Sequence, residues 1–164
     1  MAPADGLCKI NHTNSAIKTE GDGKAPSGVF AITSLFGNKK EINFKMPYFQ
    51  VTKNIHCVDD INSKLYNKIV PKQDGYTSYE TMLRDDGLYN LGAVIEHNSN
   101  PIIKKRGSCI FLHISANRAT AGCTSMEKTK LREVFNSLDK KKKPLLIQLP
   151  KAIYNGLSLG SLIK

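Results

Sequence analysis

Ser108-Cys109-Ile110-Phe111-Leu112-His113 is the most informative part of this sequence, together with the polar loop that follows it and ends at Cys123. The stretch follows Gly107 and is rich in β-branched, aromatic and aliphatic residues, a composition typical of a buried strand. Beyond Cys123, apolar residues recur at the spacing of one helical face: Leu131, Val134, Phe135 and Leu138. We therefore expect a strand, a loop and a helix, with a histidine and a cysteine at the two junctions.

The start of the expected helix lies close to the cysteine. Thr124 and Glu127 have the spacing of a capping box, and Ser125 is an alternative N-cap. Either choice places Cys123 just outside the first helical turn. The unpaired N–H groups and the positive end of the helix dipole would then stabilise a thiolate at Cys123.

These residue types suit acyl transfer. His113 is the candidate general base for a Cys123 nucleophile. Gly122 has no Cβ, so the backbone can turn sharply there, and we expect the N–H groups of Gly122 and Cys123 to hold an oxyanion. The alternative is that Cys123 is a small buried hydrophobe and His113 a structural residue at a strand end.

Composition restricts the classes of protein. The chain has 164 residues, of which 40% are hydrophobic, enough for one domain with a real core. No stretch approaches the roughly 20 apolar residues of a membrane helix, and residues 1–5 do not resemble the start of a signal peptide. The net charge of +10 favours acidic partners. Nucleic acid is not expected, because Trp is absent and no basic helix carries interleaved aromatic residues, although charge alone keeps it as an alternative.

The cysteines raise two further alternatives. The spacings Cys8-x-x-x-His12 and Cys109-x-x-x-His113 resemble half-sites for zinc, but a complete site would consume His113, and Cys-x-x-Cys pairs are missing. We expect no metal and no cofactor. A disulfide between Cys57 and Cys109 is the favoured alternative for an oxidising compartment.

The rest of the chain predicts a β-rich mixed α+β domain with many short strands and few helices. Residues 1–18 form a poorly defined N-terminal segment, residues 19–154 the catalytic domain and residues 155–164 a flexible tail. Short helical elements are expected near residues 63–67 and at 77–83, and a basic run at 140–143 should end the main helix. Strands are expected at residues 29–32, 42–46, 92–98, 108–113 and 144–150.

The ordered motifs of this chain resemble the YkuD-type L,D-transpeptidase catalytic domain family. The matching pieces lie at residues 21–30, 57–60, 63–67, 96–98, 107–113 and 120–126. The resemblance implies a YkuD-like β-sandwich with a helix after the nucleophile, and a periplasmic or other extracytoplasmic protein. It also implies Cys123 as nucleophile and His113 as base, with the backbone carbonyl of Ile114 orienting the imidazole.

The implied substrate is the tetrapeptide stem of peptidoglycan. Cys123 would attack the carbonyl of its third, dibasic residue and expel the terminal D-alanine. The acyl group would then pass to an amine of another stem, as in an L,D-transpeptidase, or to water, as in an L,D-carboxypeptidase. A third reading is a non-catalytic module that binds the cell wall, because the strands that the family has before residue 21 look largely absent from residues 1–18. This chain also has Ala121 where many members have a histidine. The oligomeric state stays open.

Four further residues are weaker candidates for substrate binding. His97 and Asn98 end an expected strand, and a structural hydrogen-bonding role is their alternative. Arg118 lies in the loop between His113 and Cys123, where it could pair with a substrate carboxylate or simply be exposed. Thr120 lies in the same loop.

Overall fold

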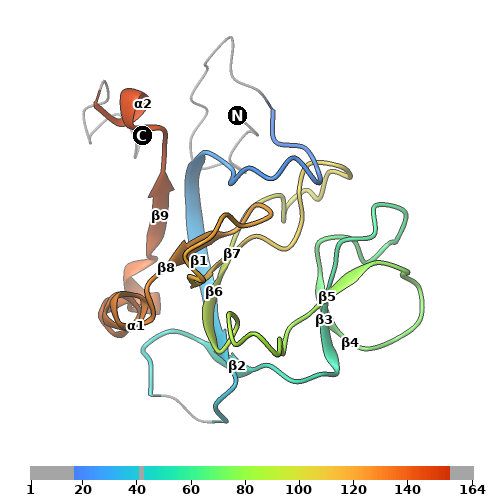
Figure 1. Cartoon of the computed structure of the whole chain (residues 1–164), viewed down its shortest axis with the longest axis horizontal. Helices are drawn as coiled ribbons and strands as arrows, with labels where there is room; N and C mark the ends of the chain where they lie inside the picture. The colour runs from blue at the N-terminus through green and yellow to red at the C-terminus, as the bar shows by residue number, and fades with distance from the viewer. Residues whose placement is uncertain (1–16, 41–42, 156–164) are drawn as a thin grey trace.

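The computed structural model describes residues 17–40 and 43–155 (Figure 1). A six-stranded sheet has the order β2-β1-β6-β7-β8, and β9 also pairs with β1. Its strands are β1 (Gly28–Gly37), β2 (Tyr48–Gln50), β6 (Leu91–Ile95), β7 (Phe111–Ile114), β8 (Thr124–Met126) and β9 (Leu145–Gln148). A smaller sheet has the order β4-β3-β5, formed by β3 (Ile55–Val58), β4 (Ile69–Pro71) and β5 (Tyr79–Thr81).

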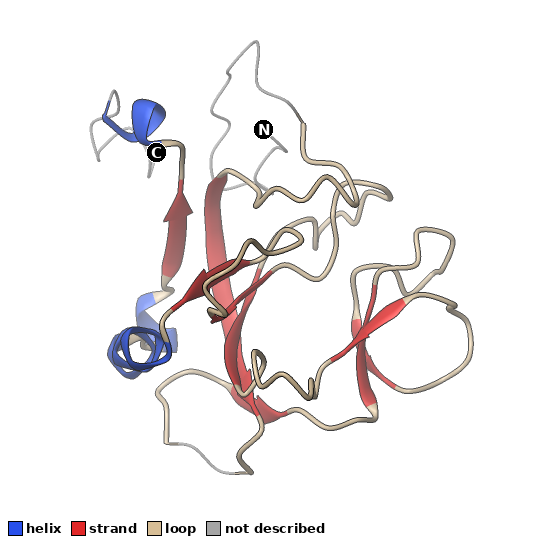
Figure 2. Ribbon diagram, in the orientation of Figure 1, coloured by secondary structure: helices blue, strands red, loops and turns tan. Residues whose placement is uncertain are grey.

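The large sheet lies between the small sheet on one side and helix α1 (Lys128–Ser137) on the other (Figure 2). A short 3-10 turn (Lys140–Lys142) and helix α2 (Lys151–Asn155) flank β9. This β-rich α+β arrangement, with two sheets and a helix that follows the cysteine-bearing loop, confirms the expected fold class.

Strand β1 organises the large sheet because it pairs along its whole length. Residues 28–31 pair with β9, and Ile32 and residues 34–37 pair with β6, with a register shift between Ile32 and Ser34. The β-branched and aromatic side chains of β1 are mostly buried, as expected for a central strand.

Alternation along the strands divides the core into two clusters. Leu112 of β7 packs with Leu131 and Phe135, the buried residues of α1. The neighbouring Phe111 packs on the opposite face of the sheet with the cluster that includes Cys57 of β3. One face of the large sheet is therefore covered by α1, and the other faces the small sheet.

The expected position of the helix start is wrong. Residues 124–126 form β8, which pairs in parallel with β7, and α1 begins at Lys128 with Glu127 as its N-cap. The Glu127 carboxylate accepts hydrogen bonds from the N–H groups of Thr129 and Lys130. The capping-box pattern failed because pairing with the edge of β7 satisfies backbone groups that the local signal assigned to a helix.

Two other local expectations are also wrong. A helix was expected at residues 77–83, but β5 forms there, because this segment pairs with β3. Of the strand expected at 42–46, residue 42 lies outside the described residues, and residues 43–46 contribute an isolated bridge from Lys45 to Asp139. The basic run at 140–143 does not end α1, since Leu138 caps that helix and a separate 3-10 turn follows.

The remaining strand expectations agree with the structure. The strands expected at residues 29–32, 92–98, 108–113 and 144–150 overlap β1, β6, β7 and β9. The expectations for residues 1–16 and 156–164 lie outside the described residues. Within residues 17–40 and 43–155, no helix has both the length and the apolar character required to cross a membrane.

Candidate active site

A cleft of about 320 Å³ opens where the end of β7, the loop before β8 and the segment from β5 to β6 meet. It brings together His113 and Cys123, the two residues that the sequence placed at strand and loop junctions. The cleft is lined by Glu80, Arg84, Leu88, Tyr89, His113, Ala116, Arg118, Ala119, Thr120, Ala121 and Cys123.

The pairing of β7 with β8 explains why the two side chains share this cleft. His113 is in register with Ser125, and Cys123 lies two residues before Ser125. Because strand side chains alternate, His113 and Cys123 belong to the same face of the sheet as Phe111. This is the face turned toward the small sheet and away from α1.

The imidazole of His113 is buried, with 4% of the residue exposed. Its Nδ1 lies 2.8 Å from the carbonyl oxygen of Ile114. Since a carbonyl only accepts, Nδ1 carries the hydrogen and Nε2 keeps a free lone pair. Burial lowers the pKa of His113, so the ring is neutral near pH 7 and able to take a proton at Nε2.

The Cys123 sulfur lies between two backbone groups. The thiol donates to the carbonyl oxygen of Cys109 at 3.4 Å, and the N–H of Phe111 donates to the sulfur at 3.4 Å. Burial and, after it, the Glu80 carboxylate raise the pKa of Cys123 to about 11. Cys123 is therefore a thiol near pH 7. The expected stabilisation of a thiolate by a helix start is wrong, because α1 begins beyond β8.

A tight turn precedes Cys123. Gly122 has a φ of 154°, a conformation that favours glycine. A Cβ at this position would lie 3.4 Å from the carbonyl oxygen of Lys24, so the loop at 18–24 packs against the turn. From the other side, the Thr120 hydroxyl donates to the carbonyl oxygen of Cys123 at 2.6 Å. The turn is thus held on both sides.

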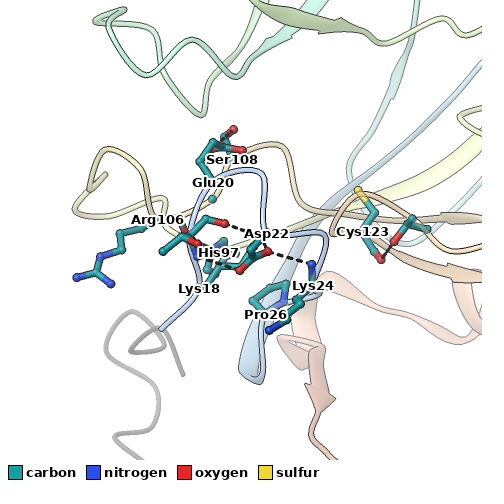
Figure 3. Close-up of polar contacts among 12 residues, drawn as sticks. Lys18, Glu20, Asp22, Lys24, Pro26, His97, Arg106, Ser108 and Cys123 are labelled. Carbon is teal, nitrogen blue, oxygen red and sulfur yellow. Dashed lines mark hydrogen bonds and ion pairs between the residues drawn. The ribbon is translucent and has the colours of Figure 1, made fainter. Parts of the chain in front are cut away.

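The loop at 18–24 is itself braced by an ion pair (Figure 3). The buried ammonium of Lys18 contacts the Asp22 carboxylate, which also accepts hydrogen bonds from the N–H groups of Thr19 and Lys24. Burial opposes ionisation of Asp22, but these hydrogen bonds outweigh it and lower its pKa to about 2. The Glu20 carboxylate of this loop accepts a 2.8 Å hydrogen bond from Ser108, just before β7.

His97 and Asn98 are not among the residues that line the cleft. The His97 Nε2 lies 2.9 Å from the carbonyl oxygen of Arg106. The Asn98 amide donates to the carbonyl oxygens of Ile103 and Gly107 at 2.8 and 2.9 Å. Both side chains are buried and tie together the ends of the loop that follows β6. The structure therefore gives them a bracing role in place of the expected contact with substrate.

Arg118 does line the cleft and is largely exposed, with 69% of its side chain accessible. Its guanidinium lies 4.0 Å from the Asp86 carboxylate. Asp86 is held more closely by Arg84, through contacts of 3.0 and 2.6 Å. Arg118 therefore remains available to a ligand at the mouth of the cleft.

Sequence reasoning missed the cleft residues Glu80, Arg84 and Tyr89, whose side chains carry titratable groups. The Tyr89 hydroxyl donates to Glu80 at 2.5 Å, and the Arg84 guanidinium lies 5.2 Å from the centroid of the Tyr89 ring. Their signal was weak, because residues 77–83 carried a helical pattern and the strand that holds Glu80 forms only by pairing with β3.

The structure pairs Cys57 with Cys109 in a disulfide that joins β3 to the segment before β7. Cys109 is thus not a zinc ligand, and Cys8 and His12 lie outside the described residues. Among the residues that the structure describes, no group of three His, Cys, Asp or Glu side chains is placed to hold a metal ion.

Comparison with family models matches residues 7–147 to the L,D-transpeptidase catalytic domain, YkuD. This match covers most of the chain, which therefore belongs to the YkuD family of L,D-transpeptidase catalytic domains. Enzymes of this family act on the peptides of peptidoglycan. No curated protein and no solved structure matched the chain.

Proposed function

We propose that this protein is a peptidoglycan L,D-transpeptidase that forms a thioester between Cys123 and the stem tetrapeptide. The observation that carries the proposal is the shared cleft of Cys123 and His113, with the imidazole fixed by the Ile114 carbonyl. A cysteine beside a neutral, oriented imidazole is the arrangement that cysteine acyl transfer requires.

In the proposed reaction, the Cys123 thiol turns from the Cys109 carbonyl and gives its proton to Nε2 of His113. The sulfur bonds to the carbonyl carbon of the third, dibasic residue, and the N–H groups of Gly122 and Cys123 receive the oxyanion. The tetrahedral intermediate then collapses. The bond to the terminal D-alanine breaks, and His113 returns the proton to the leaving amine.

The thioester is resolved by a second nucleophile. An amine from a neighbouring stem attacks the thioester carbonyl, loses a proton to His113 and forms a cross-link, while the sulfur leaves as the thiol. Water in place of the amine gives a tripeptide, the L,D-carboxypeptidase outcome. Both reactions use the same residues of the chain.

The electrostatics of the cleft support a mechanism in which Cys123 transfers its proton to His113 in the same step as the sulfur attacks the substrate carbonyl. The pKa of Cys123 is raised by burial and by Glu80, and the pKa of His113 is lowered by burial. Both shifts favour a neutral thiol and a neutral imidazole over a preformed ion pair. In the proposed reaction, Cys123 gives its proton to His113 only as its sulfur attacks the substrate carbonyl.

Three features support a substrate that carries carboxylates and a location outside the cytoplasm. Arg118 and Thr120 line the cleft, and we assign them to substrate binding at its mouth. The net charge of +10 attracts an acidic polymer. The disulfide between Cys57 and Cys109 persists in oxidising compartments, which supports a periplasmic or other extracytoplasmic location.

The test is mass spectrometry of purified tetrapeptide muropeptides after incubation with the oxidised protein. Cross-linked dimers support transfer, and conversion to tripeptides alone supports hydrolysis. Cys123→Ala is the matched control, and a thioester adduct on Cys123 should be seen in the unaltered protein. Binding to sacculi with neither product nor adduct would identify a non-catalytic wall-binding module and overturn the proposal.

A further inference from the structure

Glu80 and Tyr89 form a hydrogen-bonded pair inside the cleft that the proposed reaction leaves without a role. The Tyr89 hydroxyl donates to Glu80 at 2.5 Å. Both residues line the cleft together with Cys123 and His113. A charge-assisted hydrogen bond of this length is strong, and it stands beside the reacting sulfur.

The position of the Tyr89 hydroxyl is fixed by packing. The residue is 4% exposed, and its ring meets Phe36, Phe111 and His113 edge to face, at centroid distances of 5.7, 5.5 and 5.2 Å. The Arg84 guanidinium also lies near the ring. These contacts hold the ring in one position, with its hydroxyl directed to Glu80 inside the cleft that Cys123 also lines.

Glu80 is also placed by the architecture. It is in register with Cys57 across β3 and β5, and Cys57 is bonded to Cys109, whose carbonyl oxygen accepts the Cys123 thiol. The disulfide therefore connects the strand that carries the carboxylate to the backbone that holds the nucleophile.

We propose that Glu80 and Tyr89 are positioning residues that control the ionisation of Cys123. With Glu80 ionised, the phenolic hydrogen is directed to the carboxylate and away from the sulfur. When Glu80 is uncharged, or when the side chain at this position is too short to accept the hydrogen bond, the phenolic hydrogen turns to the Cys123 sulfur and stabilises the thiolate. The inference rests on the nucleophile assigned in the proposed function.

Electrostatics agree with this geometry. Burial raises the pKa of Glu80, and the Glu80 charge in turn raises the pKa of Cys123, second only to burial. The Tyr89 side chain acts in the opposite direction and lowers the pKa of Cys123. Glu20, Asp59 and Arg84 act on Glu80, and Arg84 also acts on Cys123. His113 and Arg118 line the same cleft, and Asp86 pairs with Arg84 and Arg118.

The experiment measures the rate of Cys123 alkylation by iodoacetamide from pH 6 to 10 in the oxidised protein, with the site identified by peptide mass spectrometry. It compares Glu80→Gln, Tyr89→Phe and the double variant with the unaltered protein. Glu133→Gln is the matched control, because it removes a carboxylate from the exposed face of α1.

Glu80→Gln should raise the alkylation rate at pH 7.5 at least fivefold and move the profile to lower pH. In the Tyr89→Phe background, Glu80→Gln should raise the logarithm of the alkylation rate by less than half as much. Glu133→Gln should leave the profile unchanged. A Glu80→Gln rate within twofold of the unaltered protein overturns the inference, and so does an equal effect in both backgrounds.

If the Glu80→Gln variant does not fold, the Glu80→Asp variant replaces it in the alkylation experiment. It keeps the charge but shortens the side chain, which frees the phenol and should raise the rate at least twofold. An unchanged or lower rate overturns the inference. These measurements need no turnover, so their failure is distinct from failure of the proposed function, which is judged by muropeptide products and the thioester.

Discussion

At the scale of single residues, the cleft holds Cys123, the proposed nucleophile, in the protonated form. The Cys123 thiol, the neutral imidazole of His113 and the Glu80–Tyr89 pair are all buried or half-buried on one face of the sheet. Burial alone disfavours the Cys123 thiolate. The proposed catalysis therefore depends more on the position of His113 as proton acceptor than on a preformed thiolate.

Substitution of the two central residues should separate catalysis from stability. We expect Cys123→Ala to abolish muropeptide turnover, because no other sulfur lines the cleft among its described residues. His113→Ala should lower the rate by at least about a hundredfold, the usual scale of general-base catalysis. Rates come from muropeptide assays, and urea unfolding should show little loss of stability in Cys123→Ala. Near-normal turnover by Cys123→Ala would falsify the mechanism.

The raised pKa of Cys123 predicts a pH dependence of stability. The folded thiol keeps its proton up to about pH 11, whereas an ordinary cysteine loses it near pH 9.0. The folded state therefore binds more protons between these values, and the free energy of unfolding falls as pH rises. From pH 7 to pH 10 the loss should be about 1.4 kcal/mol.

This loss should be missing from Cys123→Ala, so the comparison isolates the thiol from other groups that titrate in the same range. Urea unfolding of both proteins at pH 7 and pH 10 measures it. A pH-dependent difference near zero would contradict the raised pKa.

At the scale of elements, the disulfide is the covalent link between the two sheets. It closes a loop of 52 residues, from β3 to the segment before β7. Replacement of both cysteines by alanine should lower the free energy of unfolding by about 2–4 kcal/mol, the typical contribution of such a bridge. Urea titration of the oxidised protein and of the double variant tests this, and equal midpoints would count against it.

The elements also show why some structure could be read from the sequence and some could not. The strand before His113 and the helical face of Leu131 and Phe135 were predictable, because their signals are local and periodic. β8 was not, since residues 124–126 carry a capping pattern and become a strand only through the edge of β7.

The same reasoning explains the site. His113 and Cys123 were predictable because they stand at the two ends of one loop. Glu80 reaches the cleft on β5, which exists only by pairing with β3, a contact that no local pattern encodes, and Tyr89 lies in the segment between β5 and β6.

At the scale of the whole molecule, the net charge of +10 should strengthen binding of the protein to the acidic peptidoglycan polymer. Attraction between exposed charges is screened at high ionic strength. Binding to isolated sacculi should therefore weaken by roughly tenfold or more between 50 and 500 mM NaCl, as measured by co-sedimentation. A neutral polysaccharide serves as the control, and binding independent of salt would show that charge has no part in the encounter.

The pairing of β1 with β9 also has a consequence for the folding of the newly synthesised chain. Residues 28–31 pair with residues 145–148, so this ladder closes only after almost all of the described chain has been made. Contacts between such distant segments slow folding and leave intermediates with an open strand edge. During translation, the half of β1 that awaits β9 is unpaired, and a nascent chain that stalls before residue 145 would present that edge to chaperones or to other chains.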